Sequence, residues 1–224
     1  MALASSNKLE NRVNSCDDDA SPSSFTFETI SKQARGVLKC FEEAVKIENT
    51  NVTLWIEYGL VAYQFHSHAS RELKKLSTTS SGEPSAVSSS MDDSAKAGLQ
   101  KCRDEMLGVA RKAYLSATSK PSRDAGNDGV AASEDSEEEW LRHYMLGKTA
   151  EKNKGGKPET YFEHYKQAAI HLHNDNAKYP KKIGYTPPTY SLEAMEVFFR
   201  LNASVLKLLL ESCPSKEEEM KVLE

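Results

Sequence analysis

The side chains of this sequence that can act as acids, bases or metal ligands include six histidines. His66 and His68 stand two positions apart, as do His171 and His173, so the members of each pair lie on different helical faces. His164 and His171 are seven positions apart and can share one face. No carboxylate or cysteine accompanies them at the spacing of a zinc site. We therefore expect surface or half-buried histidines, with no bound metal or other cofactor.

The cysteines and the common catalytic motifs offer no further site. Cys16, Cys40, Cys102 and Cys213 are widely scattered and form no CxxC pair. Such cysteines are typical of free thiols in a reducing compartment. The sequence has no GxSxG, P-loop, GxGxxG or HExxH pattern, and no nucleophile and base stand in a recognisable arrangement. We therefore expect that the chain is not an enzyme.

Two charged segments are candidate contact sites for a partner. An acidic block over residues 134–139 can attract a basic protein surface. Acids at a helix start also complement the helix dipole, and we favour this second explanation. Ser133 and Ser136 precede acids in this block and are candidate kinase sites. A loop before the last predicted helix combines aromatic and basic side chains, namely Lys178, Tyr179, Lys181 and Lys182. This loop either contacts an acidic partner or phosphate, or packs its tyrosine and solvates its lysines.

Composition narrows the class of protein. The formal net charge of −4 does not favour a general nucleic-acid binder, so we expect no direct sequence-specific contact with nucleic acid. Hydrophobic residues make up 38% of the chain, which is low enough that some segments are not expected to fold. The apolar runs are too short for a signal peptide or a membrane span. We expect a soluble, intracellular chain without membrane contact.

The hydrophobic pattern predicts an all-α fold. Apolar residues recur every three or four positions, which is the helical period, over about 27–48, 54–65, 99–117, 137–152, 158–172 and 191–212. Pro158 suits the first turn of its helix, and Asn51 or Thr53 can cap the second. No alternating pattern long enough for a strand occurs.

Polar, serine-rich segments divide the predicted domains. We expect a disordered segment over 1–24 and a helical-repeat domain over 25–212, interrupted by flexible insertions at about 77–95 and 119–135. Residues 213–224 read as the start of a further, truncated helix. Because the two insertions lack apolar anchors, we expect rapid amide exchange and early proteolysis there.

The spacing of aromatic and small residues predicts tetratricopeptide-like repeats. This repeat is a pair of helices of about 34 residues, with a large aromatic and a glycine in helix A and a small-large-small pattern in helix B. Phe41 and Ala44 fit the end of one helix B, and Trp55 with Gly59 fit the next helix A. The helix B of that second unit follows the first insertion and supplies Ala110, Tyr114 and Ala117. A generic helical bundle is the alternative.

A second, degenerate unit follows the other insertion. Its helix A carries Trp140, Leu146 and Gly147, and its helix B carries Tyr165 and Ala168. Trp140 stands too far before the Leu-Gly pair for the usual spacing. We nevertheless expect Trp140 to belong to the repeat core, so the predicted fold is a tetratricopeptide-like α-α superhelix with disordered insertions.

Several long segments resemble one family. These are "LWIEYGLVAYQFHSHASRELKK", "CRDEMLGVARKAY", "EEEWLRHYMLGKTAEK", "YFEHYKQA", "KYPKKI" and "LEAMEVFFRLNASVLKLL". They are similar to the middle region of the calcineurin-binding Cabin family and of its fungal Hir counterparts. The resemblance covers about residues 27–210.

This resemblance implies a nuclear scaffold subunit of the HIRA histone chaperone complex, which deposits histone H3.3 with H4 independently of replication. The implied partners are other subunits of that complex, with only an indirect link to the histones. Nothing in the sequence matches the family's calcineurin-binding segment. The alternative is a tetratricopeptide adaptor that acts outside chromatin, for example one that binds peptide C-termini. The absence of basic residues around Trp55 counts against that peptide-binding class.

Overall fold

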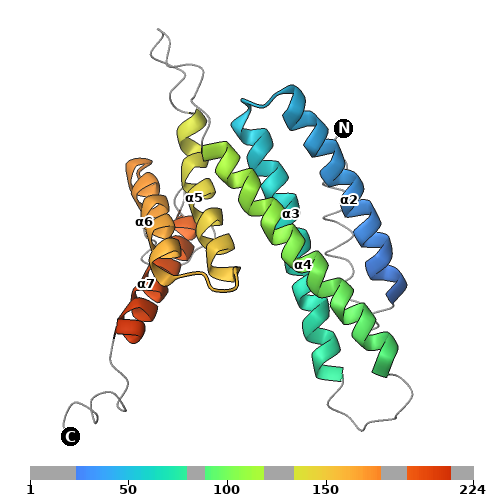
Figure 1. The fold of residues 1–224 in the computed structure, drawn as a ribbon. Coiled ribbons are helices and arrows are strands. Elements are labelled where there is room, and N and C mark those ends of the chain that lie inside the picture. Colours follow the sequence, from blue (N-terminus) through green and yellow to red (C-terminus); the bar gives the residue numbers. More distant parts are fainter. Residues whose placement is uncertain (1–23, 80–88, 119–133, 178–190, 213–224) are drawn as a thin grey trace, which may run out of the picture. The chain divides into compact units, whose positions relative to one another are not determined.

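The computed structural model describes residues 24–79, 89–118, 134–177 and 191–212. These residues form the helices α2 (Ser24–Ile47), α3 (Val52–Thr79), α4 (Ser89–Thr118), α5 (Glu134–Lys152), α6 (Pro158–Asn174) and α7 (Ser191–Ser212) (Figure 1). No strand occurs in the four described ranges. The predicted all-α class is therefore confirmed for this part of the chain.

Local chemistry explains several helix ends. The Asn51 side chain accepts a hydrogen bond from the backbone N–H of Leu54 at 3.0 Å, which is the contact of a helix N-cap. Pro158 occupies the first turn of α6, where its missing N–H costs nothing. At the other end of α6, Asn176 has a φ of 59°, and the Ala177 N–H bonds to the Leu172 carbonyl at 2.9 Å. This is the Schellman arrangement, in which asparagine tolerates the left-handed conformation.

The helices extend further into the predicted insertions than the sequence indicates. Helix α3 continues to Thr79 and α4 already begins at Ser89, so both ends of the segment predicted as an insertion at 77–95 are helical. Ser77 and Thr78 each donate a hydrogen bond from the side-chain hydroxyl to the Lys74 carbonyl, which lets these polar residues remain in a helical turn. Of the segment predicted as disordered over 1–24, residues 1–23 lie outside the described residues, and Ser24 is the first residue of α2. Residues 213–224 and most of the second insertion also lie outside them.

The chain divides into two compact units, Met1–Pro121 and Ser122–Glu224, and each is described by itself. In the N-terminal unit, α3 and α4 form an antiparallel pair. Gly59, early in α3, lies against Tyr114, late in α4, while Ala69 and Leu73 cluster with Leu99 at the opposite ends of the same helices. Helix α2 packs on α3 (Figure 1).

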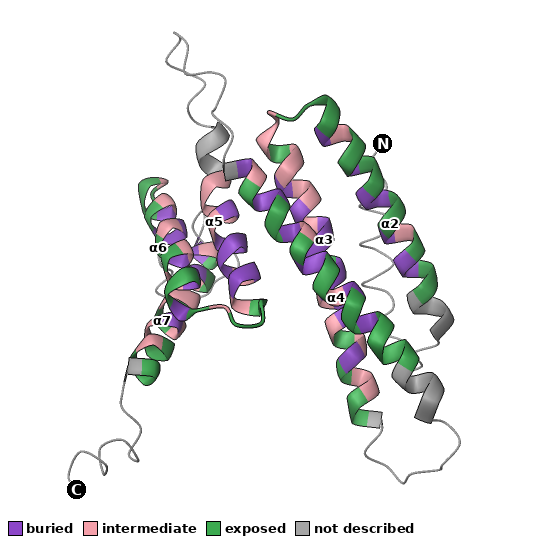
Figure 2. Cartoon of the chain, in the orientation of Figure 1, coloured by how far each residue is buried: buried purple, intermediate pink, exposed green. Residues whose placement is uncertain are grey.

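Stripes of buried apolar side chains hold the N-terminal unit together (Figure 2). Phe41 of α2 is fully buried and stacks on Tyr58 of α3, with ring centroids 6.1 Å apart. Cys102 of α4 is also buried, and burial raises the pKa of its thiol, whereas Cys40 of α2 is exposed. The core is therefore shared by all three helices of this unit.

The C-terminal unit contains α5, α6 and α7. Helices α5 and α6 are antiparallel: Gly147 of α5 contacts Tyr165 of α6, whereas His143, one turn earlier on α5, stacks on His171 near the end of α6. Helix α7 runs parallel to α5: Tyr144 bonds to Glu196 and, further along both helices, Glu151 pairs with Lys207. Leu172 of α6 and Val197 of α7 are buried in this unit.

Helix α7 carries a row of large, exposed apolar side chains, which we call the α7 stripe: Leu192, Phe199, Leu206, Leu209 and Leu210. Phe199 is 67% exposed and Leu210 is 74% exposed. The first three members are separated by seven residues each, which places them along one side of the helix. Despite these side chains, no helix in the described ranges is long and apolar enough to cross a membrane.

Candidate functional site

A close glycine–tyrosine contact joins the two helices of the α3–α4 pair. A methyl group placed on Gly59 would lie 2.6 Å from the Tyr114 ring, which is shorter than carbon atoms tolerate. Tyr114 itself is fully buried between small residues of its own helix, Ala110 and Ala117, which are buried as well. The absence of a side chain at Gly59 therefore sets how closely α4 approaches α3.

The same contact occurs in the α5–α6 pair. A methyl group on Gly147 would lie 2.5 Å from the Tyr165 ring, and Tyr165 is 1% exposed. Leu146 and Ala168, which the sequence places in the same repeat core, are buried too. Each unit thus has a helix pair in which a glycine of the first helix receives a tyrosine of the second.

The two tryptophans predicted as repeat core are less buried than Tyr114 and Tyr165. Trp55 is partly exposed, and its indole N–H donates to the Asn49 carbonyl at 2.8 Å. Trp140 is also partly exposed and lines a shallow pocket with Tyr144, Leu192, Glu193, Glu196 and Val197. Ala44 is partly exposed as well. Trp140 therefore lies where α5 meets α7, since the other residues of this pocket belong to these two helices.

Glu151 is the centre of a polar network that joins all three helices of the C-terminal unit. The Tyr165 hydroxyl donates to Glu151 Oε2 at 2.9 Å, and Lys207 Nζ donates to Oε1 at 2.7 Å. Arg200 adds an ion pair at 3.3 Å. Burial alone raises the pKa of Glu151, but the hydrogen bonds from Lys207 and Tyr165 outweigh it and leave this pKa below its usual value.

We expect Glu151→Gln to destabilise the protein by about 1–3 kcal/mol at neutral pH, because it removes hydrogen bonds to a charged acceptor. Since the folded-state pKa of Glu151 is lowered, its contribution is present above the usual carboxyl pKa of 4.5 and is lost as pH falls through the folded value. Melting curves from pH 7 to pH 3 should therefore converge for wild type and variant. A constant difference across that range would contradict this role. Glu163→Gln, on the exposed side of α6, is the matched control.

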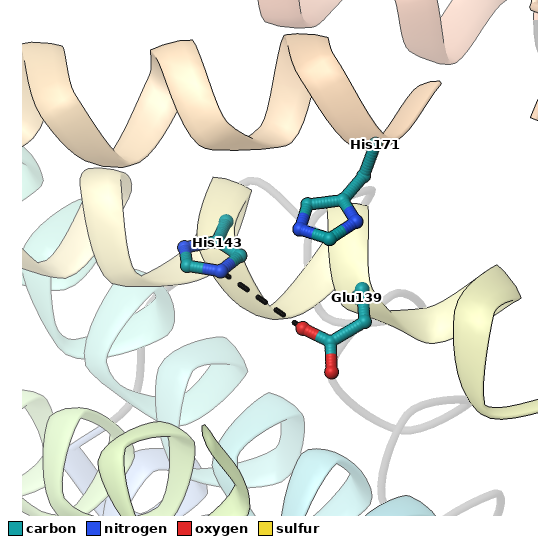
Figure 3. A group of neighbouring side chains, drawn as sticks. All are labelled: Glu139, His143 and His171. Atoms are coloured by element: carbon teal, nitrogen blue, oxygen red, sulfur yellow. Dashed lines mark ion pairs between the residues drawn. The ribbon is translucent and has the colours of Figure 1, made fainter. Parts of the chain in front are cut away.

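A histidine cluster lies between α5 and α6 (Figure 3). His143 of α5 stacks on His171 of α6 with ring centroids 5.4 Å apart, and the His164 ring lies 6.1 Å from His143. Glu139, one turn before His143 on α5, directs its Oε2 toward His143 Nε2 at 3.9 Å. The other carboxylate oxygen, Oε1, pairs with Arg142. Glu139, His143 and His171 place one ligand atom each within 4.8 Å of one another.

Burial in the cluster favours the neutral form of two of its imidazoles, His143 and His171. Burial, followed by the neighbouring His171, His164 and Arg142, lowers the pKa of His143 to about 4. Burial also lowers the pKa of His171. A neutral imidazole has one unprotonated nitrogen, and this is the form in which histidine binds a metal ion.

This cluster corrects one expectation from the sequence, that no carboxylate accompanies the histidines. The expectation failed because His143 stood alone in the sequence, and its partners become neighbours only when α5 packs against α6. The spacing of Glu139 and His143, one helical turn apart, was the available signal. In the N-terminal unit, His66 and His68 are buried instead of half-buried, and His66 Nδ1 lies 2.9 Å from the Arg103 carbonyl oxygen.

The remaining sequence candidates are charged or polar. Lys178, Tyr179, Lys181, Lys182 and Ser133 lie outside the described residues. Of the acidic block, Glu139 points into the histidine cluster instead of outward. No family model matches the chain, and no solved structure matches it.

Proposed function

We propose that this chain is a non-enzymatic helical-repeat scaffold that acts in the nucleus, within a HIRA-type histone chaperone complex. In this role it supports deposition of histone H3.3 with H4 independently of replication. The observation that carries the scaffold class is the recurring glycine–tyrosine contact. The family assignment is supported by the segments that resemble the Cabin and Hir proteins, which include both helices of each pair.

Two observations support a tetratricopeptide-like repeat: the glycine–tyrosine contact and the shared direction of α5 and α7. In that repeat, a glycine of helix A lets helix B approach closely, and Gly59 with Tyr114 has this relation, as Gly147 has with Tyr165. Successive A helices of such an array run in the same direction, as α5 and α7 do. Helix α7 then takes the position of the next helix A.

A scaffold of this kind needs a surface for its partners, and the α7 stripe is the best candidate. A row of large apolar side chains that is half to three-quarters exposed is costly in water and is typical of an interaction site. Amphipathic helices dock on such surfaces through apolar side chains spaced along one face. We therefore propose that a subunit of the complex covers this stripe.

Co-precipitation tests this proposal. The full chain, expressed in nuclei with a HIRA-type complex, should capture subunits of that complex. Phe199→Asp combined with Leu206→Asp should reduce this capture at least tenfold, because two charged groups would have to be buried at the interface. The variant should keep its melting temperature, since both side chains are more than half exposed.

Ile170→Asp is the control, because it places one aspartate at an exposed apolar position on α6 instead of α7. It should leave capture unchanged. Equal capture by wild type and the stripe variant would contradict docking on α7. Failure of the wild-type chain to capture any histone-chaperone subunit would contradict the family assignment, and the scaffold would then belong to another assembly.

A further inference from the structure

We propose that Glu139, His143 and His171 form a binding site for a divalent transition metal, with Zn²⁺ as the best fit, between α5 and α6. This site goes beyond the scaffold function and does not depend on it. Its three ligands come from two antiparallel helices of one unit (Figure 3). A bound ion would therefore connect the helix pair directly.

The geometry is close to what a zinc ion requires. Zinc binds imidazole nitrogen and carboxylate oxygen at about 2.0–2.2 Å, so tetrahedral ligand atoms stand about 3.3–3.6 Å apart. Here the three ligand atoms lie within 4.8 Å of one another, and His143 Nε2 and Glu139 Oε2 are only 3.9 Å apart. Rotation of the imidazole rings out of their present stacked arrangement can close the remaining distance.

Arg142 contacts one of the three proposed ligands, Glu139, and can orient its carboxylate. Its guanidinium pairs with Glu139 Oε1, while Oε2 of the same carboxylate faces His143. The carboxylate can therefore keep Arg142 on one oxygen and offer the other to a metal ion. Carboxylates that ligate metals are commonly oriented by such a hydrogen bond. The Arg142 side chain is itself buried, so its ion pair with Glu139 is shielded from water.

The choice of ligands selects the type of ion. Two imidazole nitrogens and one carboxylate oxygen suit zinc and its transition-metal neighbours, whereas Mg²⁺ and Ca²⁺ prefer sites made of oxygen atoms. Water would then occupy the fourth coordination position of the zinc ion. His164 is a poorer fourth ligand, because it lies two helical turns from His171 on the same helix. The positive charge of Arg142 opposes the ion, so we expect micromolar rather than nanomolar affinity.

Calorimetric titration of the full, metal-free chain with ZnCl₂ tests the site. We expect one ion per chain with micromolar affinity, and no binding of Mg²⁺ in the same range. His143→Gln and His171→Gln should each weaken zinc binding at least tenfold. Zinc should raise the melting temperature of the wild type, and EDTA should reverse this increase.

The control variant is His173→Gln, because His173 lies on the same helix as His171 but is exposed and outside the cluster. It should bind zinc like the wild type. Titration with Co²⁺ adds a readout of ligand type: nitrogen and oxygen ligation gives visible ligand-field bands without the ultraviolet charge-transfer band of a thiolate. A thiolate band would place the ion on the cysteines and overturn the proposal.

Two further results would also overturn it. One is the absence of zinc binding to the wild type at micromolar to submillimolar concentration. The other is equal affinity in the wild type and in His171→Gln, which changes a partly exposed side chain and is expected to fold normally. Circular dichroism of each variant separates loss of the site from loss of the helices, so His171→Gln decides the question even if His143→Gln unfolds.

Discussion

Replacing Tyr114 with alanine is expected to destabilise the N-terminal unit by about 3–5 kcal/mol. The side chain is fully buried, and it fills the space that Gly59 leaves open on α3. Its removal creates a cavity that α3 can close only by moving toward α4 along the contact between the two helices. Urea denaturation followed by circular dichroism would measure the change.

Leu115→Ala is the matched control for this prediction. Leu115 is the next residue on α4 but is 45% exposed, so its truncation should cost less than about 1 kcal/mol. A Tyr114→Ala protein as stable as this control would show that Gly59 and Tyr114 are not the central contact of the α3–α4 pair.

The second large effect is expected at the glycine itself. Gly59→Leu should destabilise the same unit by about 1–3 kcal/mol, because even its first side-chain carbon would stand 2.6 Å from the Tyr114 ring. At an exposed helical position the same change should be stabilising, since leucine is a better helix former than glycine by almost 1 kcal/mol. The sign of the effect therefore distinguishes a packed glycine from an exposed one.

Gly108 provides that comparison within the same unit. It lies on α4, it is exposed, and a carbon atom placed on it would meet nothing within 4 Å. Gly108→Leu should raise the melting temperature while Gly59→Leu lowers it. Combining Gly59→Leu with Tyr114→Ala should cost less than the sum of the two single changes, because the leucine occupies the space of the missing ring. Strict additivity would contradict direct contact between the two positions.

The helices could be predicted from the sequence because their signals are local. Pro158 marks the start of α6, and the three- and four-residue spacing of apolar side chains locates α7. The pairing of Gly59 with Tyr114 was also accessible, since the tetratricopeptide pattern relates a glycine to an aromatic residue on the following helix. The serine-rich helix ends were missed because the hydroxyls of Ser77 and Thr78 bond back to the preceding turn, which composition does not reveal.

The histidine cluster and the Glu151 network could not be predicted, for a different reason. Each depends on side chains from separate helices that meet only after packing. His143 has no special neighbours in the sequence beyond Glu139, and it gains His164 and His171 from α6. Glu151 likewise reads as an ordinary charge near a helix end until α6 and α7 bring Tyr165 and Lys207 against it. For Trp140 the sequence predicts too much burial. Its size is typical of a core residue, but the side chain is partly exposed and lines a pocket between α5 and α7.

Because Cys102 is buried, its reaction with a thiol reagent can report how often the helices of the N-terminal unit separate. A thiol reacts with alkylating reagents as the thiolate and only when it is accessible, and Cys102 lacks both properties while α4 remains packed. Exposed Cys40 of α2 would be modified at once and can serve as the internal standard. The slower modification of Cys102 then measures how often the packed helices separate, a rate that each substitution at Gly59 or Tyr114 should increase.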